Sequence, residues 1–129
     1  MSKRKKRSEG SRPQAPPVSP WEVRYHPQAR AEADAVPDRE SKAIDSAVDK
    51  LASLGPILPF PHSSKVMGDP GGSLRELRPR AGRSPCRCIY QRIGDVFVIG
   101  AVGPEAQKDK AGFDSAVRAA KARLAEVEP

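Results

Sequence analysis

The sequence contains few of the residues that build metal centres and disulfide frameworks. It has two cysteines, Cys86 and Cys88, and two histidines, His26 and His62. These residues lack the paired spacing of a structural zinc site. Two cysteines that lie two apart on an extended strand can bond to each other only with strain. We therefore expect two free thiols, in a reducing cytoplasm, and no metal site.

Long apolar segments are also absent. No run approaches the roughly 18 consecutive apolar residues of a membrane span, and no apolar stretch follows the basic N-terminus as it would in a secretory signal peptide. These absences predict a soluble, cytoplasmic protein without a membrane partner.

The first twenty residues lack aromatic side chains and have an unbalanced charge. They contain six Lys/Arg residues, one Glu and four prolines. Such a segment cannot bury enough apolar surface to fold, so we expect a disordered basic tail over 1–20 and one folded domain over 21–129. The tail could contact nucleic acid or acidic protein, serve as a nuclear address, or act only as a solubilising extension.

Positive charge is concentrated in the middle of the domain. Residues 65–92 contain seven Lys/Arg residues against Asp69 and Glu76, whereas the domain as a whole is nearly balanced. A local cationic cluster on a balanced body points to a polyanionic partner, nucleic acid first, because guanidinium groups match phosphate geometry. The alternative is a solvated basic sheet edge that prevents aggregation.

The spacing of apolar residues predicts the first elements. Alternation over 21–26 indicates a half-buried strand, and Pro27 begins a short helix. The apolar stripe within 37–54 indicates a second helix, which Gly55 and the following proline end. Residues 57–73 have the composition of a long loop, and such loops are often functional.

Three strands, over 74–78, 86–93 and 96–102, and a helix from Lys110 complete the predicted domain. Short turns join these strands, so they must be antiparallel neighbours. We predict an α+β fold with a small antiparallel sheet of about four strands in the order β-α-α-β-β-β-α. The helices are expected to pack on one face, which leaves the arginines on a partly open face.

Four segments carry a more specific signal. They are Trp-Glu-Val-Arg-Tyr-His at 21–26, Leu-Gly-Pro-Ile-Leu-Pro at 54–59, Gly-Ser-Leu-Arg-Glu-Leu-Arg at 72–78 and Cys-Arg-Cys-Ile-Tyr-Gln-Arg-Ile-Gly-Asp at 86–95. Together with the predicted element order, these segments resemble the RelE/ParE toxin superfamily, and within it the phage-derived HigB-like branch.

This resemblance implies the toxin of a type II toxin–antitoxin pair. Many such toxins bind the ribosome and cut mRNA in the decoding site without a metal or other cofactor. The resemblance therefore implies an endoribonuclease whose partners are the ribosome, mRNA and an antitoxin protein, the antitoxin being of helix-turn-helix type in the HigB-like branch. Other members poison DNA gyrase, so a gyrase-inhibiting toxin and a catalytically degraded RNA- or protein-binding module stay as alternatives.

The resemblance also points to a site. In cleaving members an arginine at the place of Arg87 faces the scissile phosphate, where a fixed cation stabilises the transition state. The reaction needs a base for the 2′-hydroxyl and an acid for the leaving oxygen, and Arg78, Tyr90 and His62 are the further catalytic candidates. Where related toxins carry a tyrosine near the last helix, this chain has Phe113, which exchanges no proton. The expected RNA-binding residues are Lys65, Arg75, Arg80, Arg83, Arg92, Lys108 and Lys110.

Overall fold

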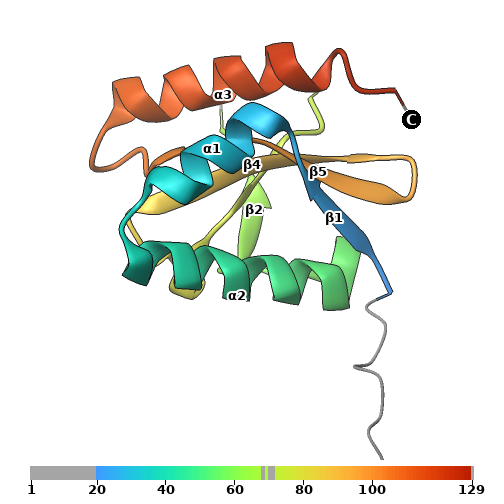
Figure 1. Ribbon diagram of the computed structural model, residues 1–129, viewed down its shortest axis with the longest axis horizontal. Helices are drawn as coiled ribbons and strands as arrows, with labels where there is room; N and C mark the ends of the chain where they lie inside the picture. The colour runs from blue at the N-terminus through green and yellow to red at the C-terminus, as the bar shows by residue number, and fades with distance from the viewer. Residues whose placement is uncertain (1–19, 68, 70–71, 129) are drawn as a thin grey trace, which may run out of the picture.

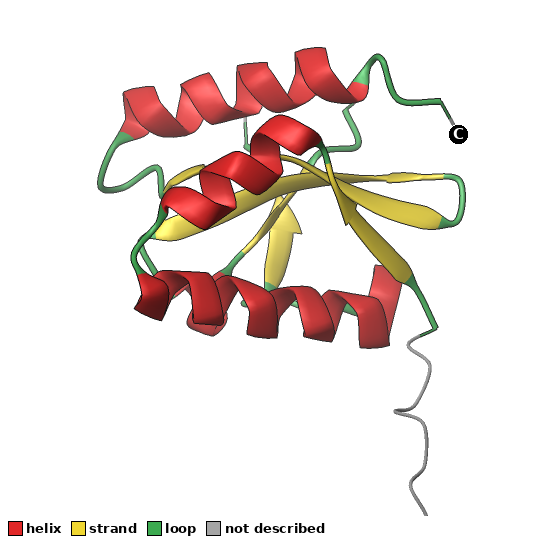
Figure 2. Cartoon of the chain, viewed as in Figure 1, coloured by secondary structure: helices red, strands yellow, loops and turns green. Residues whose placement is uncertain are grey.

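The computed structural model describes residues 20–67, 69 and 72–128, so the predicted tail, apart from Pro20, lies outside the described residues. Within them the chain forms three α-helices and a five-stranded sheet (Figures 1 and 2). The elements are β1 (Glu22–Tyr25), α1 (Pro27–Ala35), α2 (Asp38–Leu54), β2 (Ser63–Lys65), β3 (Arg75–Leu77), β4 (Cys86–Ile93), β5 (Val96–Pro104) and α3 (Lys110–Leu124), with short 3-10 helices η1 (Gly55–Ile57) and η2 (Pro79–Gly82).

Local sequence explains where the helices begin and end. His26 caps α1 by accepting a hydrogen bond from the Gln28 N–H, and Asp109 caps α3 through the Gly112 N–H. Helix α2 carries Asp38 and Glu40 in its first turn, where negative charge is favourable. It ends at Gly55, whose φ of 58° suits glycine.

The sheet has the strand order β1-β5-β4-β3-β2. Strands β2 to β5 pair antiparallel, and β4 lies between β3 and β5 as the short turns predict. Strand β1 pairs with β5 in parallel. The turn between β4 and β5 contains Gly94 with a φ of 63°, the left-handed conformation that this hairpin requires.

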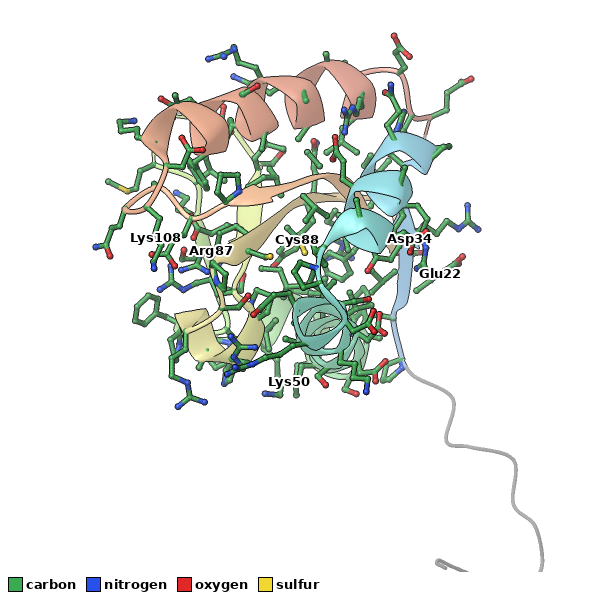
Figure 3. All side chains as sticks on the ribbon, turned by 60° about the vertical axis from the view of Figure 1, so that its left-hand side comes forward. Glu22, Asp34, Lys50, Arg87, Cys88 and Lys108 are labelled. Carbon is green, nitrogen blue, oxygen red and sulfur yellow. The ribbon has the colours of Figure 1, made fainter. Side chains whose placement is uncertain are left out.

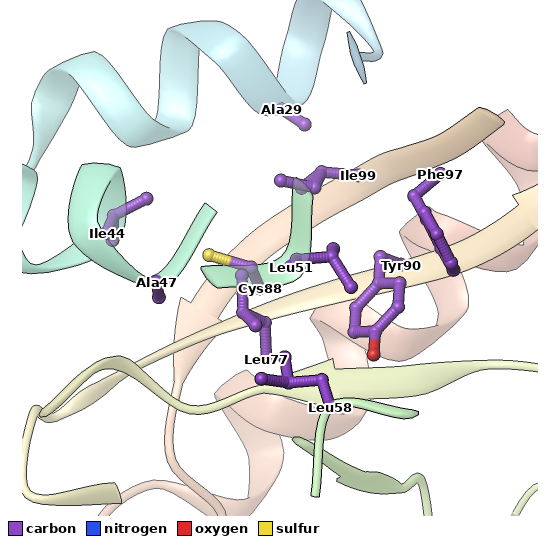
Figure 4. Close-up of a cluster of buried hydrophobic side chains, with 10 residues drawn as sticks. All are labelled: Ala29, Ile44, Ala47, Leu51, Leu58, Leu77, Cys88, Tyr90, Phe97 and Ile99. Carbon is purple, nitrogen blue, oxygen red and sulfur yellow. The ribbon is translucent and has the colours of Figure 1, made fainter. Parts of the chain in front are cut away.

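Helices cover both faces of the sheet. Figure 1 shows α3 above the sheet and α2 below it. On the α2 side, Ile44, Ala47 and Leu51 pack with Ala29 of α1 and with residues of β3, β4 and β5 in the cluster drawn in Figure 4. On the other side, four α3 residues pack against β4 and β5; they are Phe113, Ala116, Ala120 and Leu124.

The predicted α+β class is confirmed, the predicted elements occur in the predicted order, and three details are corrected. The sheet has a fifth strand, because residues 63–65 of the expected loop pair with β3. It is mixed, because β1 runs parallel to β5. Helices pack on both faces, since β4 and β5 have apolar residues on each side, such as Ile89 on one and Cys88 on the other. The open face that we expected to carry the arginines is therefore absent from the described part of the chain.

An ion pair connects α1 to α3. Arg123 donates from both terminal nitrogens to the Glu32 carboxylate, at 3.1 and 2.9 Å, and Glu32 also accepts from the Val102 N–H. Burial raises the pKa of Glu32, but the hydrogen bonds from Arg123 and Val102 and the Arg123 charge outweigh burial and hold this pKa below its usual 4.5. The pair therefore stabilises the fold only while Glu32 is ionised.

We expect Glu32→Gln to make the free energy of unfolding less dependent on pH. Because the pKa of Glu32 is lower in the folded state, its stabilisation is present above about pH 4.5 and is lost as the pH falls through the folded-state value. Urea unfolding of wild type and variant between about pH 7 and pH 3 measures this. Two parallel stability curves would contradict the assignment.

Candidate nucleic-acid interface

A basic pocket lies between α2 and the segment that follows β3. Its volume is about 680 Å³. Among the described residues that line it, none carries a carboxylate, whereas six carry positive charge. These six are Arg39, Lys42 and Lys50 from α2 and Arg78, Arg80 and Arg83 from the segment 78–83. The pocket is therefore suited to an anion with several negative charges.

Helix α2 supplies half of this charge. Arg39, Lys42 and Lys50 follow one face of the helix, with Ser46 between them, at separations of three, seven and eleven residues from Arg39. Only the apolar stripe of this helix was predicted from the sequence, and the basic stripe beside it was not. The same spacing was the signal that would have found it.

The segment 78–83 is held against α2 by a carboxylate of the helix. Glu40 accepts a hydrogen bond from the Ser84 hydroxyl at 2.7 Å and pairs with Arg80 at 3.2 Å. The hydrogen bond from Ser84 lowers the pKa of Glu40; burial opposes this, and the hydrogen bond and charge of Arg80 add to the lowering, so that the pKa lies below its usual range. Arg80 and Ala81 have φ values of 53° and 56°, a strained conformation that surrounding contacts must maintain.

Arg87 lies elsewhere than expected. Its side chain is 6% exposed, and its guanidinium donates to Glu76 at 3.1 Å and to the backbone carbonyls of Ser84, Cys86 and Gly82. It does not line the basic pocket, and Figure 3 labels it beside the sheet, apart from Lys50 at the bottom of the view. In this structure these donors are used inside the protein, where the residue shapes the segment 82–86. That Arg87 faces a phosphate stays a prediction.

Arg78 connects this buried network to the pocket. It donates to the same Glu76 oxygen as Arg87, at 3.0 Å, and to the Pro61 carbonyl at 2.9 Å. It also lines the pocket, with a side-chain exposure of 22%. Of the predicted catalytic arginines, Arg78 is therefore the one that a ligand in the pocket can reach, and its contacts hold it in place.

The other two catalytic candidates, His62 and Tyr90, lie in different parts of the structure. His62 lines the pocket and is partly exposed. Tyr90 is 2% exposed in the cluster of Figure 4, with its hydroxyl 2.6 Å from the Ser63 hydroxyl and its ring edge-on to Phe97. Tyr90 is thus a core residue in this structure, and His62 is the candidate that the pocket retains.

The predicted RNA-binding residues also divide into two groups. Arg80 and Arg83 line the pocket. The other five lie outside it: Arg75 donates to Ser63, Arg92 lies over the Trp21 ring at 4.9 Å, Lys110 pairs with Asp114, and Lys65 and Lys108 are exposed.

Other kinds of site find little support in the described residues. No group of three or more His, Cys, Asp or Glu side chains there could hold a metal ion. Cys86 and Cys88 are free thiols, as predicted, and burial raises the pKa of Cys88 to about 12. Of the helices described, none has the length and apolar character needed to span a membrane.

Comparison with known proteins leaves the family of this chain open. No protein-family model and no curated protein matches the sequence. A similar solved structure is that of the archaeal RelE-RelB complex from Pyrococcus horikoshii OT3, with 24% sequence identity and a TM-score of 0.48. The match covers 66% of this chain and 94% of that chain. Neither a family nor a function follows from a likeness of this size.

Proposed function

We propose that this chain is a toxin of the RelE/ParE type that binds RNA in the basic pocket and cuts mRNA on the ribosome without a metal. The observation that carries the proposal is the clustering of six Lys/Arg residues around one pocket whose described lining has no carboxylate. The motifs at 72–78 and 86–95 support the HigB-like branch, and with it an antitoxin partner of helix-turn-helix type.

Much of the pocket's charge is available to a ligand. Among the ion pairs of the described residues, none involves Arg39, Lys42, Lys50 or Arg83, whereas Arg78 pairs with Glu76 and Arg80 with Glu40. A cation without a protein partner breaks no ion pair when it binds a phosphate. Binding also releases the counterions that the RNA had condensed, which favours the complex. The pocket therefore favours a phosphate backbone over a single small anion.

The same pocket holds groups suited to RNA cleavage. In the proposed reaction the RNA 2′-oxygen forms a bond to phosphorus and the bond to the 5′-oxygen breaks. His62 lines the pocket and a histidine side chain can act as a general base, so His62 would take the proton of the 2′-hydroxyl, while water protonates the leaving oxygen. Arg78, held by Glu76 and Pro61, would stabilise the negative charge on the phosphate oxygens.

Expression of the chain without a partner is expected to stop bacterial growth by stopping translation. Pulse labelling with an amino acid and with thymidine measures protein and DNA synthesis separately. We expect protein synthesis to fall first, with His62→Gln as a variant that binds RNA but acts slowly. If DNA synthesis falls first, the gyrase-inhibiting alternative replaces this proposal.

A further inference from the structure

One aromatic side chain is exposed next to the basic pocket. The exposed large apolar residues in the described part of the chain are Leu54, Ile57, Phe60 and Met67, and Phe60 is the aromatic one, at 68% exposure. A single exposed aromatic residue needs no explanation by itself. Its contact with Arg78, one of the six cations that line the pocket, is what suggests a role.

Arg78 joins Phe60 to the pocket. The Arg78 guanidinium carbon lies 5.1 Å from the centroid of the Phe60 ring, and Arg78 lines the pocket together with His62. The guanidinium therefore occupies one face of the ring, in a cation–π arrangement. The high exposure of Phe60 leaves much of the ring in contact with water.

The segment that carries Phe60 is anchored at both ends. Leu58 is buried in the α2-side cluster, and Ser63 is buried where β2 begins. The His62 carbonyl accepts a hydrogen bond from the Arg78 N–H at 2.8 Å. Between these fixed points Phe60 is flanked by Pro59 and Pro61, whose rings restrict the backbone. The ring is thus held beside the pocket at little further cost in entropy.

We propose that Phe60 is a base-stacking residue, on which a base of single-stranded RNA stacks while the neighbouring phosphates enter the basic pocket. An aromatic platform beside a cationic groove is the arrangement by which proteins bind single strands. A duplex hides the faces of its bases, so this site would select single-stranded RNA. The inference relies on the proposed function for RNA as the ligand, but not for its cleavage.

The test is equilibrium binding of full-length protein to three labelled RNAs by fluorescence anisotropy. These are a single strand, the duplex of the same sequence, and an abasic strand that keeps the sugar-phosphate backbone. Loss of one stacked base corresponds to about tenfold in affinity, so we expect Phe60→Ala to bind the single strand about tenfold more weakly than wild type. Phe60→Trp should restore binding, and Ile57→Ala, which removes a nearby exposed apolar side chain, should leave it unchanged.

The abasic strand separates stacking from charge. Wild type and Phe60→Ala should bind it equally, with the same salt dependence, because the phosphate contacts remain. If the two proteins bind the base-bearing strand equally, the inference is overturned, and the Phe60 ring contacts only other residues of this protein. The inference would also be overturned if Phe60→Ala lost as much affinity for the abasic strand as for the base-bearing strand, or if wild type bound no single strand. If Phe60 stacks on a base but ribosome-bound mRNA is not cut, the proposed function is contradicted and the stacking inference stands.

Discussion

Arg87→Ala is expected to lower the free energy of unfolding by about 3 to 5 kcal/mol, the typical cost of removing one partner of a buried ion pair. Arg87 is 5% exposed and donates to Glu76 and to three backbone carbonyls. Alanine would remove the Arg87 donors from those carbonyls, of which the contact to Ser84 is buried. It would also leave Glu76 with Arg78 as its one remaining ion-pair partner among the described residues. Since small domains are stable by only about 5 to 15 kcal/mol, this loss is a large fraction of the total stability.

Urea denaturation of wild type and Arg87→Ala measures this loss. Arg83→Ala is the matched control, because Arg83 is exposed and changing it should shift stability by about 0.5 kcal/mol or less. A double-mutant cycle with Glu76→Gln isolates the interaction between the two side chains. If Arg87→Ala is as stable as wild type but inactive, Arg87 faces the substrate after all, as the sequence suggested.

Replacing the three α2 cations together should strongly weaken RNA binding without unfolding the domain. In the variant Arg39→Ala/Lys42→Ala/Lys50→Ala, the pocket loses three of its four cations that have no ion-pair partner among the described residues. Each lost contact to a single strand reduces the slope of log affinity against log salt by about 0.7, so the slope should fall by about 2. Alanine is the best helix former, so α2 should persist.

A charge-matched control tests whether position or net charge decides. Arg24→Ala/Arg30→Ala/Arg118→Ala removes the same charge from exposed residues outside the basic pocket. We expect this control to keep nearly the wild-type salt slope in a titration of single-stranded RNA binding. Equal losses in the two triple variants would mean that RNA responds to overall charge and that the pocket has no special role.

Much of the fold was predictable because it depends on local signals. Three residues determine the local backbone at their own positions in the sequence. They are Pro27 at the start of α1, Gly55 at the end of α2 and Gly94 in the β4–β5 turn. Strand β2 was missed because Ser63–Lys65 has no apolar alternation. It is a strand only because β3 lies beside it, and that contact exists only after folding.

The site was less predictable for the same reason. Arg87 stands in a strand among other arginines, and nothing local shows that Glu76 and the carbonyls of the segment 82–86 surround it. The basic stripe of α2 was visible in its spacing. The role of this stripe depends on the segment 78–83 that lies opposite, which Glu40 holds there through contacts 40 and 44 residues along the chain.

The most direct test of the basic pocket as an RNA-cleaving site is primer extension on ribosome-bound mRNA incubated with purified full-length protein. We expect new 5′ ends with wild type and no new ends on the same mRNA without ribosomes. We also expect at least about a hundredfold slower cleavage by the α2 triple variant, the typical cost of losing well-placed charge stabilisation. The control variant Arg24→Ala/Arg30→Ala/Arg118→Ala should cut at nearly the wild-type rate. Intact mRNA with wild type, or equal cleavage by wild type and the α2 triple variant, would contradict the assignment of the basic pocket as an RNA-cleaving site.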